Sequence, residues 1–134
     1  MVHARVLIVT ERREKIRAAA ARLAAEGYEV RIMLASAGEL ARPSAPWPEL
    51  VLLCFEGPPR ADLLADVRCR WSAPLLVWAG SSNQAEAVQA LQAGADDYVG
   101  GPLALDELAA RVVAQLRRAQ WRGPASRTAW QPAC

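Results

Sequence analysis

Apolar residues follow two different periods along this chain, and segments of the two kinds alternate. Short continuous or alternating apolar runs predict buried strands, which we place at residues 4–10, 28–33, 49–54, 74–79 and 96–99. Apolar residues spaced three and four apart predict helices at 12–26, 60–70, 83–93 and 104–118, with a weaker helical pattern at 35–42. Gly27 and Gly94 end two of the helices, and the proline-rich segment 43–48 predicts a loop.

This alternation predicts a single α/β domain. Strands that alternate with helices form right-handed βαβ units, with parallel strands and helices on both faces of the sheet. We therefore expect a flavodoxin-like (βα)5 doubly wound fold, with a five-stranded parallel sheet in the order 2-1-3-4-5. Functional groups of such folds gather at the carboxyl ends of the strands. These ends carry Thr10, Glu11, Cys54, Phe55, Glu56, Ala79, Gly80, Gly100 and Gly101.

Length and composition narrow the possibilities. The 134 residues suit one domain, which we place at 1–118, and the segment 119–134 lacks periodicity and is predicted to be a linker or disordered C-terminal tail. The chain is 53% hydrophobic, yet no apolar run approaches the ~18 residues of a membrane span, so no membrane association is expected. The N-terminus does not resemble a signal peptide, and we expect a cytoplasmic protein.

Charge and metal-binding residues exclude further classes. A net charge of +2 is too small to predict that this domain itself binds nucleic acid. Three cysteines and one histidine show no metal-ligand spacing, so neither a metal nor another cofactor is predicted.

Three segments resemble the receiver domain of response regulators. They are RVLIVTERRE after the N-terminus, PELVLLCFEGPP in the middle of the chain, and GADDYVGGPL followed by DELAARVVAQLRR near its end. The resemblance covers residues 4–118 and is to the winged-helix, OmpR/PhoB-type subfamily. It implies a module of two-component phosphorelay signal transduction, in which an aspartate accepts a phosphoryl group beside bound Mg²⁺, a hydroxyl and a lysine.

The residues at these functional positions differ from the family pattern. The resemblance places Thr10 and Glu11 at the two acidic positions, Cys54 at the phosphoacceptor, Ala79 at the hydroxyl and Gly101 at the lysine. Without the aspartate no acyl phosphate forms, and without the lysine and hydroxyl the phosphoryl oxygens have no prearranged partners. We therefore interpret the chain as an atypical pseudo-receiver that is not an enzyme.

Individual residues near this pocket have alternative interpretations. Cys54 is a small buried hydrophobic residue rather than a nucleophile, because the chain has no catalytic histidine. Glu11 and Glu56 are expected to pair with Arg12 or Arg13, and a divalent cation is the minority interpretation. Trp78 is expected either to fill the vacated pocket or to form the floor of a ligand site.

The resemblance also implies a switch, a turn and an interface. It places Tyr98 at the family's switch aromatic, whose ring we expect to lie inward beside Ala79. It implies a cis peptide bond between Gly101 and Pro102. The last helix and fifth strand are expected to form a homodimer face, with Val113 and Ala87 replacing two of the subfamily's basic residues. This face comprises Asp96, Asp97, Glu107, Arg111 and Arg118.

Three functions remain open at this point. The leading one is a phosphorylation-independent regulatory module, forming the N-terminal part of a transcriptional regulator that contacts DNA only through a domain absent from this chain. The second is a small-molecule sensor that uses the pocket around Cys54, Trp78 and Gly101. The third is a stand-alone adaptor that presents a helix face to a protein partner.

Overall fold

The computed structural model describes residues 4–35, 48–81 and 83–128, and for residues 121–128 it describes the helical backbone alone. The strands are β1 (Arg5–Thr10), β2 (Glu29–Leu34), β3 (Leu50–Phe55), β4 (Leu75–Ala79) and β5 (Asp97–Gly100). The helices are α1 (Arg17–Ala25), α2 (Ala61–Arg70), α3 (Gln84–Gln92) and α4 (Leu105–Thr128), and a 3-10 turn, η1 (Arg13–Lys15), precedes α1. The predicted helix at 35–42 and loop at 43–48 lie largely outside the described residues.

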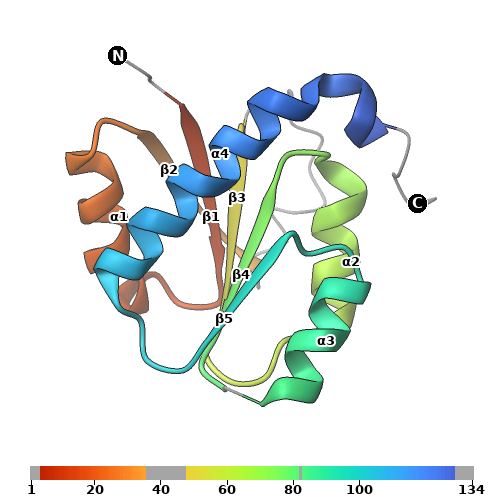
Figure 1. Cartoon of the computed structure of the whole chain (residues 1–134). Coiled ribbons are helices and arrows are strands. Elements are labelled where there is room, and N and C mark those ends of the chain that lie inside the picture. The colour runs from red at the N-terminus through yellow and green to blue at the C-terminus, as the bar shows by residue number, and fades with distance from the viewer. Residues whose placement is uncertain (1–3, 36–47, 82, 129–134) are drawn as a thin grey trace.

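The five strands form one parallel sheet in the order β2-β1-β3-β4-β5, which confirms the predicted flavodoxin-like topology (Figure 1). The register aligns Thr10 with Cys54 and Phe55 with Ala79. Residues at the carboxyl ends of neighbouring strands therefore meet at one edge of the sheet, as the sequence predicted.

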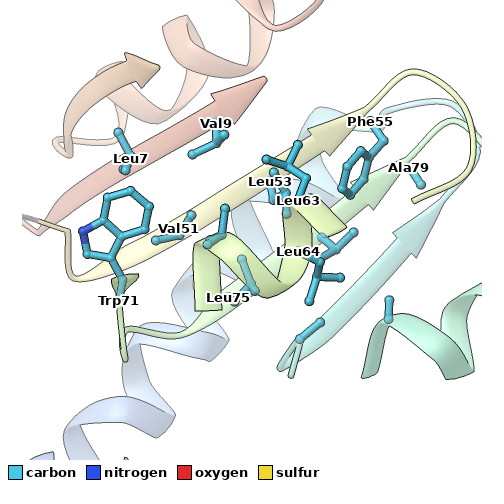
Figure 2. Close-up of a cluster of buried hydrophobic side chains, with 14 residues drawn as sticks. Leu7, Val9, Val51, Leu53, Phe55, Leu63, Leu64, Trp71, Leu75 and Ala79 are labelled. Carbon is cyan, nitrogen blue, oxygen red and sulfur yellow. The ribbon is translucent and has the colours of Figure 1, made fainter. Parts of the chain in front are cut away.

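Helices cover both faces of the sheet and enclose two apolar layers. Buried residues of β1, β3 and β4 pack against α1 and α4 on one face and against α2 and α3 on the other. Figure 2 shows the second layer, in which Leu63 and Leu64 of α2 lie over Val51 and Leu53 of β3. Continuous burial along β3 explains its unbroken apolar sequence, because a central parallel strand has no solvent-facing side.

The helix predicted at 12–26 begins differently from the prediction. Arg12 is extended, with a φ of −145°, and residues 13–15 form the 3-10 turn η1 before α1 starts at Arg17. The Thr10 hydroxyl accepts a hydrogen bond from the Arg12 amide at 3.3 Å and donates one to the Arg12 carbonyl at 3.2 Å. These bonds hold the chain in a loop where helical periodicity alone predicted a helix.

The last helix is longer than its apolar pattern indicated. Its backbone continues to Thr128, past residue 118 where the pattern predicted its end. Apolar periodicity reports the part of a helix that packs on the domain, and Gly123 and Pro124 disfavour a helix, so the sequence did not predict this extension. The division into a domain at 1–118 and a linker at 119–134 stays a prediction.

The predicted cis bond before Pro102 is wrong. All peptide bonds among the described residues are trans. Gly101 instead takes a φ of 93°, a left-handed conformation that glycine adopts readily. Its amide donates to the Ala79 carbonyl at 3.0 Å and its carbonyl accepts the Trp78 indole N–H at 2.8 Å. The turn into α4 is therefore made by Gly101, and the trans isomer, favoured by ~0.5–1 kcal/mol, is retained.

Candidate functional site

A pocket of about 310 Å³ opens at the carboxyl edge of the sheet. Its walls come from the ends of β1, β3 and β4, from the turn after β5 and from the junction of η1 with α1. Four of its residues have large apolar side chains, namely Ile16, Phe55, Trp78 and Pro102. The others are Thr10, Lys15, Cys54, Glu56, Gly80 and Gly101.

Three of the five predicted pocket residues line this space. Thr10, Cys54 and Gly101 do so, from three different strand ends. Glu11 lies beside it, with its Oε1 accepting the Glu56 amide at 3.3 Å. Ala79 is fully buried in the layer beneath α2 and α3, where Figure 2 shows it beyond Phe55 at the strand ends. The structure therefore does not bring Ala79 into the pocket lining.

Glycine determines how tightly one wall of the pocket closes. The Gly80 amide donates to the Phe55 carbonyl at 3.0 Å, which ties the loop after β4 to the end of β3. A Cβ atom at residue 80 would overlap the carbonyl oxygen of Glu56. The two loops can approach this closely only because residue 80 has no side chain.

Trp78 forms a fixed part of the wall. Its indole N–H donates to the Gly101 carbonyl at 2.8 Å, and its ring also packs against the layer beneath α1 and α4. A buried or half-buried tryptophan normally satisfies its one donor in this way. The pocket has Cys54 and Gly101 where the family pattern has an aspartate and a lysine. Trp78 therefore narrows this pocket but does not fill it.

The acidic residues beside the pocket are engaged in ion pairs. Glu56 lies 3.2 Å from the guanidinium of Arg12, and Glu11 lies 3.6 Å from that of Arg60. Pairing of Glu56 with Arg12 confirms the predicted ion pair, whereas Glu11 pairs with Arg60, which the sequence did not suggest. Among the described residues, no three Asp, Glu, His or Cys side chains gather in a group able to hold a metal ion.

Cys54 is poorly suited to act as a nucleophile. Its side chain is buried, and burial raises the pKa of the thiol well above its usual range. Because the thiolate is the reactive form, a thiol in an apolar environment reacts slowly at neutral pH. The chemistry of this residue is that of a small apolar group.

Tyr98 has its ring directed into the domain. The ring packs against the apolar layer beneath α2 and α3, and its hydroxyl donates to the Ser81 carbonyl at 2.9 Å. Burial, with a smaller contribution from Glu86, raises the pKa of this hydroxyl. The hydrogen bond connects β5 to the loop after β4, so the ring position and that loop are coupled.

A second cluster of predicted site residues lies on α4. Arg111 donates two hydrogen bonds to Asp97, at 3.0 and 2.9 Å, and also pairs with Glu107 at 2.9 Å. The hydrogen bond to Asp97, and secondarily that to Glu107, raises the pKa of Arg111. Together with Arg118, these residues line a surface hollow between β5 and α4.

Asp96 does not belong to this cluster, contrary to the sequence-based grouping. Its carboxylate accepts the Leu75 amide at 2.8 Å and pairs with Arg68 of α2 at 3.2 Å. Successive residues of an extended segment point to opposite faces of a sheet, so Asp96 and Asp97 cannot share a face. Val113 is exposed but does not line the hollow, because it follows Arg111 by two residues and lies ~200° around the helix.

The sequence analysis missed three residues of the pocket, Lys15, Pro102 and Ile16, which follows Lys15 at the start of α1. Lys15 is the only lysine of the chain, and it lines the pocket from η1, which was predicted to be part of a helix. Pro102 lines it because Gly101 turns the chain in the left-handed conformation. No local pattern marks Lys15 or Pro102, because both positions depend on the path of a loop.

Comparisons with known proteins agree with this architecture. The transcriptional regulatory protein KdpE of Mycobacterium tuberculosis is 35% identical over 115 residues, covering 84% of this chain and 51% of that protein. The sensory transduction protein RegX3 of Mycobacterium bovis is 32% identical over 115 residues, with the same coverage of 84% and 51%. The chain thus spans about half the length of these curated relatives.

Solved structures show the same fold. A CheY-like response regulator receiver domain from Methanospirillum hungatei superposes with a TM-score of 0.76 at 26% sequence identity, covering 91% of this chain and 100% of that one. No family model matches the sequence. Within the described residues, no helix is both long and apolar enough to cross a membrane.

Proposed function

We propose that this chain, which belongs to the receiver-domain family of response regulators, is a signalling module that regulates transcription without being phosphorylated. The observation that carries the proposal is the composition of the pocket at the carboxyl edge of the sheet. Thr10, Cys54 and Gly101 line it where phosphoryl transfer needs a metal-binding acid, an acceptor carboxylate and a lysine.

The covalent step lacks its acceptor. A phosphoryl group is normally transferred to a carboxylate oxygen, and Cys54 supplies instead a buried thiol whose pKa is raised by its apolar surroundings. Such a thiol is protonated at neutral pH, and although it lines the pocket it is almost fully buried. It cannot replace the carboxylate as an efficient acceptor.

Close to residue 54 the pocket also lacks the positive charge that a phosphoryl group requires, because its one cation, Lys15, lines it from η1 and lies exposed at the mouth. Glu56 lines it and Glu11 lies beside it, and both carboxylates are held in ion pairs with Arg12 and Arg60. A dianionic group placed here would meet these carboxylates, and the arginines are already paired. Negative charge that develops on a phosphoryl group is stabilised by cations and hydrogen-bond donors that are in position before the reaction. Residues 79 and 101 supply no such group here.

The switch aromatic supports activity without phosphorylation. Tyr98 is held by its hydrogen bond to Ser81 and by packing against the layer beneath α2 and α3. Ala79 belongs to the apolar layer against which this ring packs. We infer that the module keeps one conformation of this region, and that its output is controlled by expression, by a ligand or by a partner.

Intact-mass measurement after incubation with Mg²⁺ and acetyl phosphate tests the proposal. We expect no phosphoryl adduct on the wild-type protein, and none on Cys54→Asp, because Gly101 and Ala79 still supply neither the lysine nor the hydroxyl of the family pattern. A receiver domain that retains its aspartate serves as the positive control for the reagent. A stoichiometric, base-labile adduct on the wild-type protein would refute the proposal.

DNA binding and self-association belong to the same proposal. The M. tuberculosis relative is named a transcriptional regulatory protein, and this chain matches about half of it. We infer that DNA is contacted through a domain outside this chain, and that the chain forms a homodimer through β5 and α4. The hollow lined by Asp97, Arg111 and Arg118 supports such a face.

A second candidate function is supported by the pocket itself. Its volume of about 310 Å³ lies at the lower end of the range of small-molecule sites, and its walls are largely apolar. A pocket that no longer takes a phosphoryl group can take another ligand. The chain is then a small-molecule sensor.

A further inference from the structure

We propose that the pocket at the carboxyl edge of the sheet binds a small aromatic carboxylate, with the ring against Trp78 and the carboxylate at Lys15. This inference rests on the proposed function, because a phosphoryl group on residue 54 would occupy the space that the ligand needs.

The walls select an apolar, flat molecule. Ile16, Phe55, Trp78 and Pro102 supply side-chain carbon to the pocket. The indole N–H of Trp78 is already used by the Gly101 carbonyl, so the indole offers its ring and no free donor. Aromatic rings pack favourably on such a side chain in offset or edge-to-face arrangements.

The polar groups deep in the pocket are already satisfied. The Thr10 hydroxyl both donates to and accepts from the Arg12 backbone, at 3.2 and 3.3 Å. The Cys54 thiol is neutral, because burial raises its pKa. A ligand group buried here gains little from being polar, so this part of the ligand is hydrocarbon.

The charge at the mouth selects one negative group. Lys15 is exposed and lines the pocket, and among the described residues no carboxylate lies within ion-pair distance of its ammonium group. Glu56, the pocket's acidic residue, is paired with Arg12 at 3.2 Å. The unpaired charge at the mouth is therefore positive, and it complements a carboxylate attached to an apolar ring.

The pocket is rigid enough to discriminate by shape. The overlap that a Cβ atom at residue 80 would make with the Glu56 carbonyl shows that two of its loops are in backbone contact. The Gly80 amide also donates a hydrogen bond to the Phe55 carbonyl, and the Gly101 amide donates one to the Ala79 carbonyl, each at 3.0 Å. Because the walls are fixed by backbone hydrogen bonds, little ordering is needed when the ligand binds.

A titration with 2-naphthoate, matched against the uncharged 2-naphthalenemethanol, tests the inference by NMR and calorimetry. We expect 2-naphthoate to shift the Trp78 indole and Gly101 amide resonances, with the indole signal identified by its loss in Trp78→Phe. We expect Lys15→Gln to weaken 2-naphthoate binding roughly three- to fivefold, the upper range for a solvent-exposed ion pair, and to leave the alcohol unaffected.

Two further variants locate the effect at Lys15. Arg13→Gln removes a cation from the same turn that does not line the pocket, and it should bind 2-naphthoate like the wild type. Lys15→Arg keeps the charge and should retain most of the affinity. Arg13 and Lys15 are exposed to solvent, and Trp78→Phe keeps an aromatic ring, so each variant is expected to fold. Circular dichroism checks this.

The outcomes separate this inference from the proposed function. No shift of Trp78 or Gly101 with 2-naphthoate, or equal loss of affinity in Lys15→Gln and Arg13→Gln, overturns the ligand assignment and leaves the absence of phosphorylation standing. Equal affinity for the acid and the alcohol overturns the role of Lys15. A phosphoryl adduct with acetyl phosphate overturns the proposed function instead, whatever the naphthoate titration gives.

Discussion

Arg68 of α2 forms an ion pair with Asp96, the residue immediately before β5, across 3.2 Å in the interior of the domain. The two side chains are only 4% and 20% exposed. Arg68 also donates to the Ala73 carbonyl at 3.1 Å, and Asp96 accepts the Leu75 amide at 2.8 Å. This pair therefore fixes α2, the start of β4 and the start of β5 relative to one another.

Removing either partner should destabilise the domain strongly. We expect Arg68→Ala to lower the free energy of unfolding by about 3–5 kcal/mol, because it removes the buried guanidinium that pairs with the Asp96 carboxylate. Urea unfolding followed by circular dichroism measures this loss. The double variant Arg68→Ala/Asp96→Ala should lose less than the sum of the two single variants, because the partners act as a unit.

An exposed ion pair nearby provides the control. Arg60 pairs with Asp62 at 2.9 Å at the surface, where solvent screens the charges. Arg60→Ala should unfold at nearly the same urea concentration as the wild type. Equal effects of Arg60→Ala and Arg68→Ala would contradict the role assigned to the buried pair.

Gly80→Ala should disturb the pocket directly. Its new methyl group would overlap the Glu56 carbonyl, which is backbone and cannot rotate away, so we expect a loss of about 1–3 kcal/mol in stability. Gly57→Ala is the matched control, because a Cβ atom there meets nothing within 4 Å. Thermal unfolding of the two variants should differ clearly, and an unchanged midpoint for Gly80→Ala would show that the loops separate at little cost.

Burial of Cys54 should make stability depend on pH. The thiol has a raised pKa in the folded protein, so it stays protonated there while the unfolded chain loses its proton above about pH 8.5. Stability from this group is therefore complete below that pH and falls as the pH rises, by up to ~1.4 kcal/mol per pH unit. Urea unfolding from pH 7 to pH 10 under reducing conditions measures the slope.

Cys54→Ala isolates this effect from other titrating groups. Tyr98, whose pKa is also raised, contributes equally to both proteins and cancels in the difference. We expect the advantage of the wild type over Cys54→Ala to shrink steadily above pH 8.5. A difference that is constant from pH 7 to pH 10 would mean that the folded thiol ionises normally.

Charge reversal on α4 tests the proposed homodimer. Arg111→Glu replaces the cation between Asp97 and Glu107 with a third negative charge, and we expect it to shift the protein to monomer. Sedimentation velocity at micromolar concentration measures this shift.

Arg22→Glu serves as the matched control. It likewise breaks two ion pairs, with Glu26 and Asp106 at 2.9 and 2.8 Å, but these do not involve the hollow between β5 and α4. A monomeric wild type, or equal dissociation by both variants, would count against this face.

Much of this architecture follows from the sequence alone. Continuous or alternating apolar runs located every strand that the structure describes. The continuous runs arise because the central strands of a parallel sheet are buried on both faces and leave no polar positions. The handedness of βαβ units predicted a doubly wound sheet, for which the flavodoxin-like order 2-1-3-4-5 was the expectation. Thr10, Cys54 and Gly101 could be placed in one pocket because parallel strand ends meet at one edge.

Other features were decided only by the tertiary structure. Ala79 faces the layer beneath α2 and α3, Lys15 reaches the pocket from a 3-10 turn, and the Gly101–Pro102 bond is trans. The partner of Asp96 is Arg68, which lies 28 residues away in the chain. Local patterns report which residues are buried, but the path of a loop and the partner of a buried charge depend on contacts between distant segments, which form only when the sheet and its helices pack together.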